Sequence, residues 1–297
     1  MFIRRNLITL SVTLLFVLAI AGAAVADAEK AKENYNAGLK AQQEGDIEAA
    51  LIQYLAAIAE DANYIDAYIN KGAIHFERKE YDQALSTFAT ATEKAPDNAA
   101  AWANLGRVQY ALKRYPEAQA SFQKAIAVDA TDGSLYKELG KTYYYANAYP
   151  DLITTLSKAH ELGSGDHETY FMLGKAYQKS GKDSDAIGAY KKSVELKPDY
   201  YNAHSSLGQV YLGQEQYKSA ASAFKAAMKA GSGKYLAAYN YAIAVETGDP
   251  ENFDQSIQVW SDFVAKHKKN PKAKDKIAQA EQHIKELKEA VEKASLQ

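Results

Sequence analysis

The stretch "AAAWANLGRVQYALKRYPEAQASFQKAIAVDA", residues 99–130, decides the fold of this chain. Its apolar residues form two runs, Trp102, Leu105, Val108 and Leu112, then Tyr115, Ala118, Phe122 and Ala125. Steps of three and four residues place each run on one face of an α-helix. Gly106 and Ala118 are small, which allows two such helices to approach closely. The stretch therefore predicts a pair of antiparallel helices.

The helix pair recurs along the chain with a fixed period. Glycine returns every 34 residues, at Gly38, Gly72, Gly106, Gly140, Gly174 and Gly208. Sixteen residues after each glycine stands a large apolar residue: Tyr54, Phe88, Phe122, Leu156, Tyr190 and Phe224. One helix pair cannot bury its apolar face alone, so neighbouring pairs must stack. The period indicates an array of repeats.

This pattern resembles the tetratricopeptide repeat (TPR) family, whose motif has this period and these residue types. The resemblance implies an all-α fold, a right-handed solenoid of antiparallel helix pairs. Six repeats cover residues 31–234, and a degenerate seventh follows, with Ile243 in the place of the glycine. We therefore predict a TPR array of seven repeats over residues 27–270.

Residues 271–297 are predicted to form a C-terminal amphipathic capping helix. Ile277, Ile284 and Val291 are seven residues apart, and so are Ala280, Leu287 and Ala294. This stripe favours a helix that covers the last repeat. The alternative is a dimerising coiled coil, for which about three heptads is a short length. A monomer is the expected state.

The first 26 residues differ from the rest of the chain. Arg4 and Arg5 precede the apolar run "LITLSVTLLFVLAI", and "AVA" at 24–26 provides a cleavage site before Asp27. This order of segments is typical of a secretory signal peptide. We expect a periplasmic or secreted protein with no stable membrane insertion after removal of the signal. An uncleaved anchor is the alternative.

Composition argues against several function classes. The chain has no cysteine, which excludes disulfides, thiolate metal sites and thiol nucleophiles. Its formal net charge of −2 gives no general attraction for nucleic acid. The histidines lack the spacing of a metal site on a helix. "GSGDH" at 163–167 lacks the G-x-S-x-G pattern of a hydrolase and is interpreted as a turn. No catalytic residue, metal or cofactor is predicted.

The resemblance implies that the first helix of each repeat lines a concave groove that binds a partner. Two residues before the glycine stand Asn36, Asn70 and Asn104. An asparagine amide can donate to and accept from one peptide unit, and such a ladder holds extended peptides in family members. The alternative is a set of surface asparagines without a partner.

Aromatic and basic residues lie on the same predicted face. Four residues after the glycine stand Phe76, Tyr110 and Tyr144, with Tyr145 next to them; one residue after it stand Arg107, Lys141 and Lys175. These side chains suit a protein or peptide partner that carries aromatic and acidic residues. The alternative is that the rings cover the stems of neighbouring helices.

The predicted function is a non-enzymatic scaffold of the bacterial cell envelope. It would hold an extended or helical segment of a protein partner in the groove. Two other functions stay open: self-association through the C-terminal helix, and a role as accessory subunit of an envelope enzyme or export system.

Overall fold

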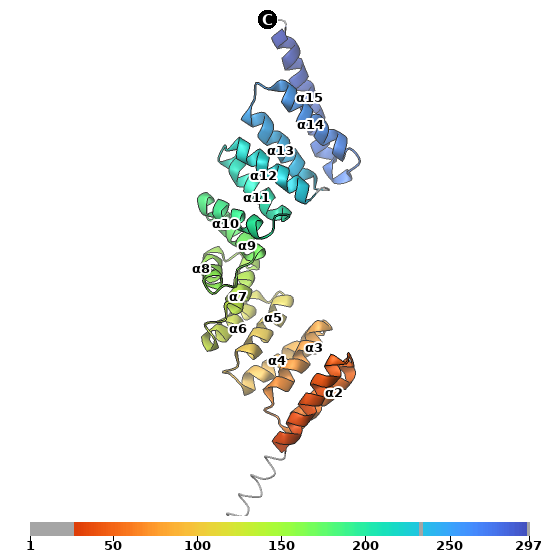
Figure 1. Ribbon diagram of the computed structural model, residues 1–297, viewed down its shortest axis with the longest axis vertical. Helices are drawn as coiled ribbons and strands as arrows, with labels where there is room; N and C mark the ends of the chain where they lie inside the picture. The colour runs from red at the N-terminus through yellow and green to blue at the C-terminus, as the bar shows by residue number, and fades with distance from the viewer. Residues whose placement is uncertain (1–26, 232–233, 296–297) are drawn as a thin grey trace, which may run out of the picture. The chain divides into compact units, whose positions relative to one another are not determined.

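The computed structural model describes residues 27–231 and 234–295, so the predicted signal peptide at 1–26 lies outside it. Contacts group the chain into two compact units, Met1–Thr142 and Tyr143–Gln297. The described residues form helices, turns and loops without a strand, which confirms the all-α prediction (Figure 1). Each unit is described below by itself.

Each predicted repeat supplies a first helix and a second helix. The first unit consists of a helix at 27–43, α2 (Ile47–Glu60), α3 (Ile65–Glu77), α4 (Tyr81–Lys94), α5 (Ala99–Ala111), α6 (Tyr115–Val128) and most of α7 (Gly133–Tyr145). The second unit continues with α8 (Tyr149–Glu161), α9 (His167–Lys179), α10 (Asp183–Leu196), α11 (Tyr201–Gly213), α12 (Tyr217–Ala230), α13 (Tyr235–Gly248), α14 (Phe253–His267), a 3₁₀ turn (Pro271–Ala273) and α15 (Lys274–Ser295). The stretch at 99–130 is thus α5 followed by α6, as predicted.

Local signals mark where helices begin. Asn98 accepts a hydrogen bond from the backbone N–H of Ala101 at 2.9 Å and so caps the start of α5. Pro116 and Pro150 lie in the first turns of α6 and α8, where the missing N–H costs nothing. Both proline positions were predicted from the sequence.

In the first six repeats, the turn between the two helices has one left-handed residue. It is Gly45, Lys79, Lys113, Asn147, Gly181 or Glu215, with φ between 58° and 83°. A lysine or glutamate in this conformation costs about 1 kcal/mol relative to glycine. The same backbone turn thus recurs with the repeat period, although its residue type varies too much for the sequence to reveal it.

In every repeat of the first six except the fourth, which has Leu156, the repeated glycine lies against the ring that follows it by sixteen residues. A Cβ atom on Gly106 would be 2.9 Å from Cε1 of Phe122, and one on Gly174 would be 2.5 Å from Cδ1 of Tyr190. Phe122 and Tyr190 are buried. The close approach predicted from the small residues is therefore present, and the ring fills the space that a side chain would need.

Burial corrects the register of the seventh repeat. Ala242 is fully buried and has the place in α13 that Gly208 has in α11. Ile243, which the sequence pattern put there, is only half-buried. Trp260 packs with Ala242 in the core of this repeat. A larger ring facing alanine replaces the ring-on-glycine contact, which explains why the glycine period ends at Gly208.

The helix α15 packs on the seventh repeat. Ala280 and Leu287 are buried in one cluster with Trp260 and Phe263, and Ile277 and Ile284 pack against that cluster. The first four residues of the predicted stripe therefore pack against the rest of this chain and are not available to a second copy. Of the remaining two, Val291 is half-buried and Ala294 is exposed. This packing favours the capping helix over the dimerising coiled coil.

Candidate functional site

The predicted asparagine ladder lies in the first unit and is partly used within the chain. Asn70 Nδ2 donates to the Tyr35 hydroxyl at 3.0 Å. Asn104 Oδ1 accepts from Arg107 Nη1 at 2.9 Å. Asn36 is exposed. Two of the three amides thus have intramolecular partners, and the peptide ladder stays a prediction.

The predicted aromatic row of the first unit packs on the second helices. The ring centroid of Phe76 is 5.7 Å from that of Tyr81, at 60°. The centroid of Tyr110 is 5.9 Å from that of Tyr115, at 62°. Both arrangements are edge-to-face contacts within one repeat. They support the alternative in which the rings cover neighbouring helices, although Phe76 and Tyr110 keep part of their surface exposed.

In two repeats the position four residues after the glycine holds a glutamine instead of an aromatic or apolar residue, and the structure shows why. The Tyr54 hydroxyl donates to Gln42 Oε1 at 2.8 Å, and the Tyr190 hydroxyl donates to Gln178 Oε1 at 2.9 Å. Both tyrosines are fully buried, and burial raises the pKa of Tyr190 well above its usual range. A buried hydroxyl needs an acceptor. Repeats with a phenylalanine as ring residue have Phe76, Tyr110 or Leu212 in the place of the glutamine.

This pairing leads to a prediction with an internal rescue. Gln178→Leu removes the acceptor of the buried Tyr190 hydroxyl and should lower the free energy of unfolding by about 1–3 kcal/mol. Gln178→Leu with Tyr190→Phe should recover most of that loss, because Leu212 and Phe224 already form such a pair in the next repeat. Urea unfolding of both single variants and the double variant measures the coupling. If the double variant loses as much free energy of unfolding as the two single variants together, the pairing is wrong.

The second unit carries an aromatic patch, defined as Tyr144, Tyr145, His167, Phe171 and Tyr200. The ring centroids of Tyr144 and Tyr145 are 5.3 Å apart. Tyr200 packs edge-to-face on His167 at 4.9 Å and on Phe171 at 5.5 Å. Tyr145 has 49% of its surface exposed. The patch therefore offers an accessible ring beside partly buried ones.

Three elements of the second unit bring the patch together. Tyr144 and Tyr145 end α7, His167 and Phe171 begin α9, and Tyr200 is the N-cap residue of α11. Burial raises the pKa of Tyr144, and the nearby Tyr145, Tyr149 and Tyr200 add to the rise. Tyr144 and Tyr200 are thus close enough for their hydroxyl groups to interact electrostatically.

Lys175 is half-buried one helical turn after Phe171, so both side chains are on the same side of α9. Burial lowers the pKa of its ammonium group, and the neighbouring Lys179 lowers it further. A nearby carboxylate would raise this pKa. Lys175 therefore provides a positive charge that an acidic partner group would stabilise.

The sequence identified this site in part. It named Tyr144, Tyr145 and Lys175, but not His167, Phe171 or Tyr200. Phe171 has the same place, three residues before the glycine, as Tyr35 in the first repeat. Tyr200 lies outside the helix in a turn, and only the folded chain brings it to Phe171. Lys141, which is half-buried, belongs to the first unit.

The turn interpretation of "GSGDH" is confirmed. Asp166 accepts from the Thr169 backbone N–H at 2.8 Å, and Thr169 Oγ1 accepts from the Asp166 backbone N–H at 2.9 Å. This reciprocal pair caps the start of α9. His160 Nε2 lies 3.0 Å from the same Thr169 hydroxyl, and burial lowers the pKa of this histidine. Asp166 thus has a structural role.

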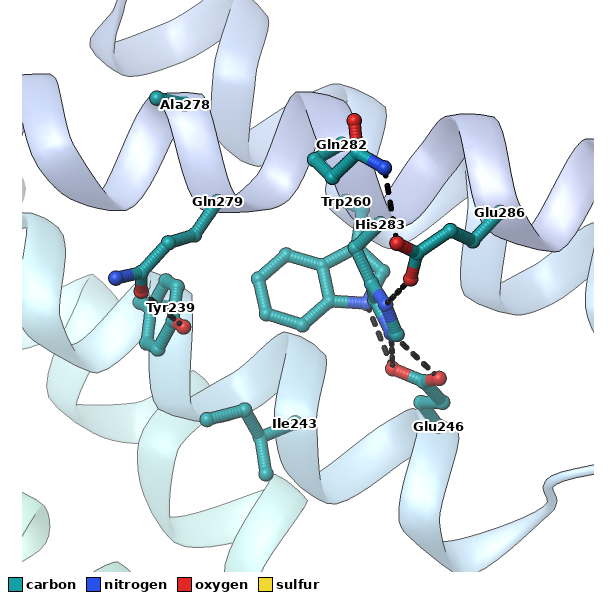
Figure 2. A pocket seen from close by; sticks show the side chains of 9 residues that line it. All are labelled: Tyr239, Ile243, Glu246, Trp260, Ala278, Gln279, Gln282, His283 and Glu286. Atoms are coloured by element: carbon teal, nitrogen blue, oxygen red, sulfur yellow. Dashed lines mark hydrogen bonds and ion pairs between the residues drawn. The ribbon is translucent and has the colours of Figure 1, made fainter.

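A hollow of about 580 Å³ lies between α13, α14 and α15 (Figure 2). Glu246 of α13 links the three helices. It accepts a hydrogen bond from Trp260 Nε1 of α14 at 2.8 Å and lies 2.7 Å from His283 Nε2 of α15. His283 also lies 3.6 Å from Glu286. Figure 2 shows these groups directed toward one another. The hollow is therefore the seam at which α15 attaches to the array.

Metal clusters and membrane-spanning helices are both absent from the described part of the chain. Over 27–231 and 234–295, histidines and acidic residues form no cluster of three or more that could hold a metal ion. Within those same residues, none of the helices has the length and apolar character that crossing a membrane requires.

Family comparisons agree with the helix pairs. A family profile described as "Tetratricopeptide repeat" matches residues 75–141, and one described as "TPR repeat" matches residues 174–215. The chain is a tetratricopeptide repeat protein. No curated protein matches this TPR protein.

Solved structures share the TPR fold. The C-terminal part of a TPR repeat-containing protein from Cytophaga hutchinsonii has a TM-score of 0.66 at 18% identity, covering 81% of this chain and 98% of that one. YrrB, "a TPR protein with an unusual peptide-binding site", has a TM-score of 0.55 at 20% identity, covering 62% and 93%. MamA has a TM-score of 0.54 at 24% identity, covering 57% and 92%. At these identities the likeness concerns the fold.

Proposed function

We propose that this TPR protein is an exported, non-enzymatic scaffold that binds a polypeptide segment of a partner at the aromatic patch. Tyr145, with 49% of its surface exposed at the edge of the partly buried rings, is the observation that carries the proposal. An exposed aromatic ring on a rigid helix end is a common anchor for protein partners. Lys175 favours a segment with an acidic residue beside an aromatic or apolar one.

Two further points support a polypeptide as the ligand. TPR arrays are generally interaction scaffolds without catalysis of their own, and YrrB, which shares the fold, has a peptide-binding site. In this chain, the rings and Lys175 belong to helices, which position side chains more firmly than loops do. In the first unit, a separate set of residues stays predicted as partner contacts: Asn36, Asn70, Phe76, Asn104, Arg107, Tyr110 and Lys141.

The binding proposal predicts a selective loss of partner capture. Tyr145→Ser with Lys175→Ser should reduce capture of a partner from envelope extract by about tenfold or more, which corresponds to about 1.4 kcal/mol of binding free energy. The matched control is Leu196→Ser with Lys158→Ser, because Leu196 is also 49% exposed but lies on a second helix. Quantitative mass spectrometry of the captured protein is the measurement. Equal capture by both variants would exclude the patch as the binding site.

Export is the second part of the proposal and rests on the sequence of residues 1–26. We expect the purified protein to begin at Asp27 and to be released with the periplasmic contents. N-terminal sequencing and fractionation measure this. A chain that keeps Met1 would contradict cleavage, and its presence in the cytoplasmic fraction would contradict export.

A further inference from the structure

A row of lysines lies at one edge of the second unit. We call it the basic edge; it consists of Lys229, Lys234, Lys266, Lys268, Lys269, Lys272 and Lys274. These residues flank the turn between α12 and α13 and the turn between α14 and α15. The rings of Tyr235 and His267, at the start of α13 and the end of α14, are 6.5 Å apart. The two turns are therefore neighbours, and their lysines form one surface.

The corresponding turns of the other repeats are acidic. Glu161 and Asp166 flank the turn before α9, and Glu195 and Asp199 flank the turn before α11. In the first unit, Asp129 begins the turn before α7 and Asp132 ends it. The reversal of charge is confined to the last two turns. Since the protein as a whole has a formal net charge of −2, the basic edge is a local concentration of positive charge.

Fold stability accounts for some of these lysines but not for those at the start of α15. Lys229 and Lys266, in the last turns of α12 and α14, interact favourably with the helix dipoles. The ammonium group of Lys234 lies 3.9 Å from the ring centroid of Tyr201, a cation–π contact. Lys272 and Lys274 precede or begin α15, where a positive charge opposes the dipole. Within the described residues, the ion pairs of this protein use basic groups outside the basic edge. Lys272 and Lys274 therefore have no stabilising ion pair among these, and an acidic ligand would reduce their repulsion with Lys268 and Lys269.

The shape of the basic edge narrows the class of ligand. A hollow of about 450 Å³ opens there, lined by Lys268, Lys269 and Lys274 and, on α15, by Ile277, Ala278 and Glu281. Its apolar residues and charged rim fit alternating apolar and acidic side chains. A flat bilayer surface would contact the lysines but not fill the hollow. We propose that the basic edge binds an acidic polypeptide segment of a partner protein, separately from the aromatic patch.

The test uses the full mature chain and a fluorescein-labelled peptide that alternates glutamate and leucine. We expect the peptide to bind, its affinity to fall steeply with salt, and the same peptide with glutamine for glutamate not to bind. A variant with Lys268, Lys269, Lys272 and Lys274 each changed to Gln should lose at least about tenfold in affinity. Fluorescence anisotropy measures the binding.

A charge-matched control variant, lipid vesicles and light scattering distinguish a peptide ligand from a membrane or a second copy of the chain. The control changes four exposed lysines elsewhere to Gln: Lys79, Lys182, Lys218 and Lys288. Retained binding by this control, with unchanged melting of both variants, supports the proposal. Absence of peptide binding, or equal loss in both variants, overturns it. Binding to phosphatidylglycerol vesicles but not to the peptide overturns it in favour of a membrane. A doubled mass in light scattering that the basic-edge variant abolishes assigns the surface to a second copy instead.

Discussion

Trp260→Ala should detach α15 from the array and lower the free energy of unfolding of the second unit by about 3–5 kcal/mol. The Trp260 side chain is 3% exposed, and its ring contacts Tyr239 at 5.1 Å and His283 at 5.6 Å. Its removal leaves a cavity and takes one hydrogen-bond donor from Glu246, which joins α13 to α15. Hydrogen exchange over residues 274–295 should become fast, while α8 to α10 stay protected.

The control for this prediction is the other tryptophan. Trp102 is only half-buried, and its indole donates to the carbonyl of Pro96 at 2.9 Å. Trp102→Ala should therefore cost less, about 1–2 kcal/mol, and leave exchange of α15 unchanged. The loss in free energy of unfolding for Trp260→Phe should lie between those of Trp260→Ala and Trp102→Ala, since phenylalanine keeps most of the ring packing. If Trp260→Ala leaves α15 protected, the capping role assigned to this seam is wrong.

Substitution by alanine should change the free energy of unfolding in opposite directions at two helical glycines of the second unit. A Cβ atom on Gly174 would lie 2.5 Å from two ring atoms of Tyr190, which is fully buried and hydrogen-bonded to Gln178. The ring cannot swing away, so overpacking should cost about 1–3 kcal/mol and exceed the gain in helix propensity. Gly174→Ala should therefore destabilise the second unit.

Gly188→Ala provides the matched comparison. Gly188 lies inside α10, and a Cβ atom there would have no atom within 4 Å. This change should stabilise the helix by about 0.5–1 kcal/mol, because alanine restricts the unfolded chain and meets no neighbour. Urea unfolding of both variants provides the measurement. Stabilisation by both alanines would show that the ring does not need the glycine.

The location of the proposed binding surface shows where sequence reasoning stops. Tyr144 and Tyr145 were identified because they depart from the repeat consensus in a helix whose faces were known. Tyr200 was not, because it precedes α11 and reaches Phe171 only through the folded turn. For the asparagines, the sequence indicated a face that carries polar side chains. The use of Asn70 by Tyr35, 35 residues away, needed the packing of neighbouring first helices.

What the sequence by itself determined is the repeating part of this protein. A glycine every 34 residues and a large apolar residue sixteen residues later specify a helix pair locally, and identical local rules repeated along a chain lead to stacking. The tertiary structure decided what depends on contacts between different repeats and at the end of the array. It selected Ala242 over Ile243 in the seventh repeat, docked α15 through Glu246, and gathered the lysines of two separate turns at one edge. Periodicity carries no information about such places, because each occurs once and depends on side chains that approach only after folding.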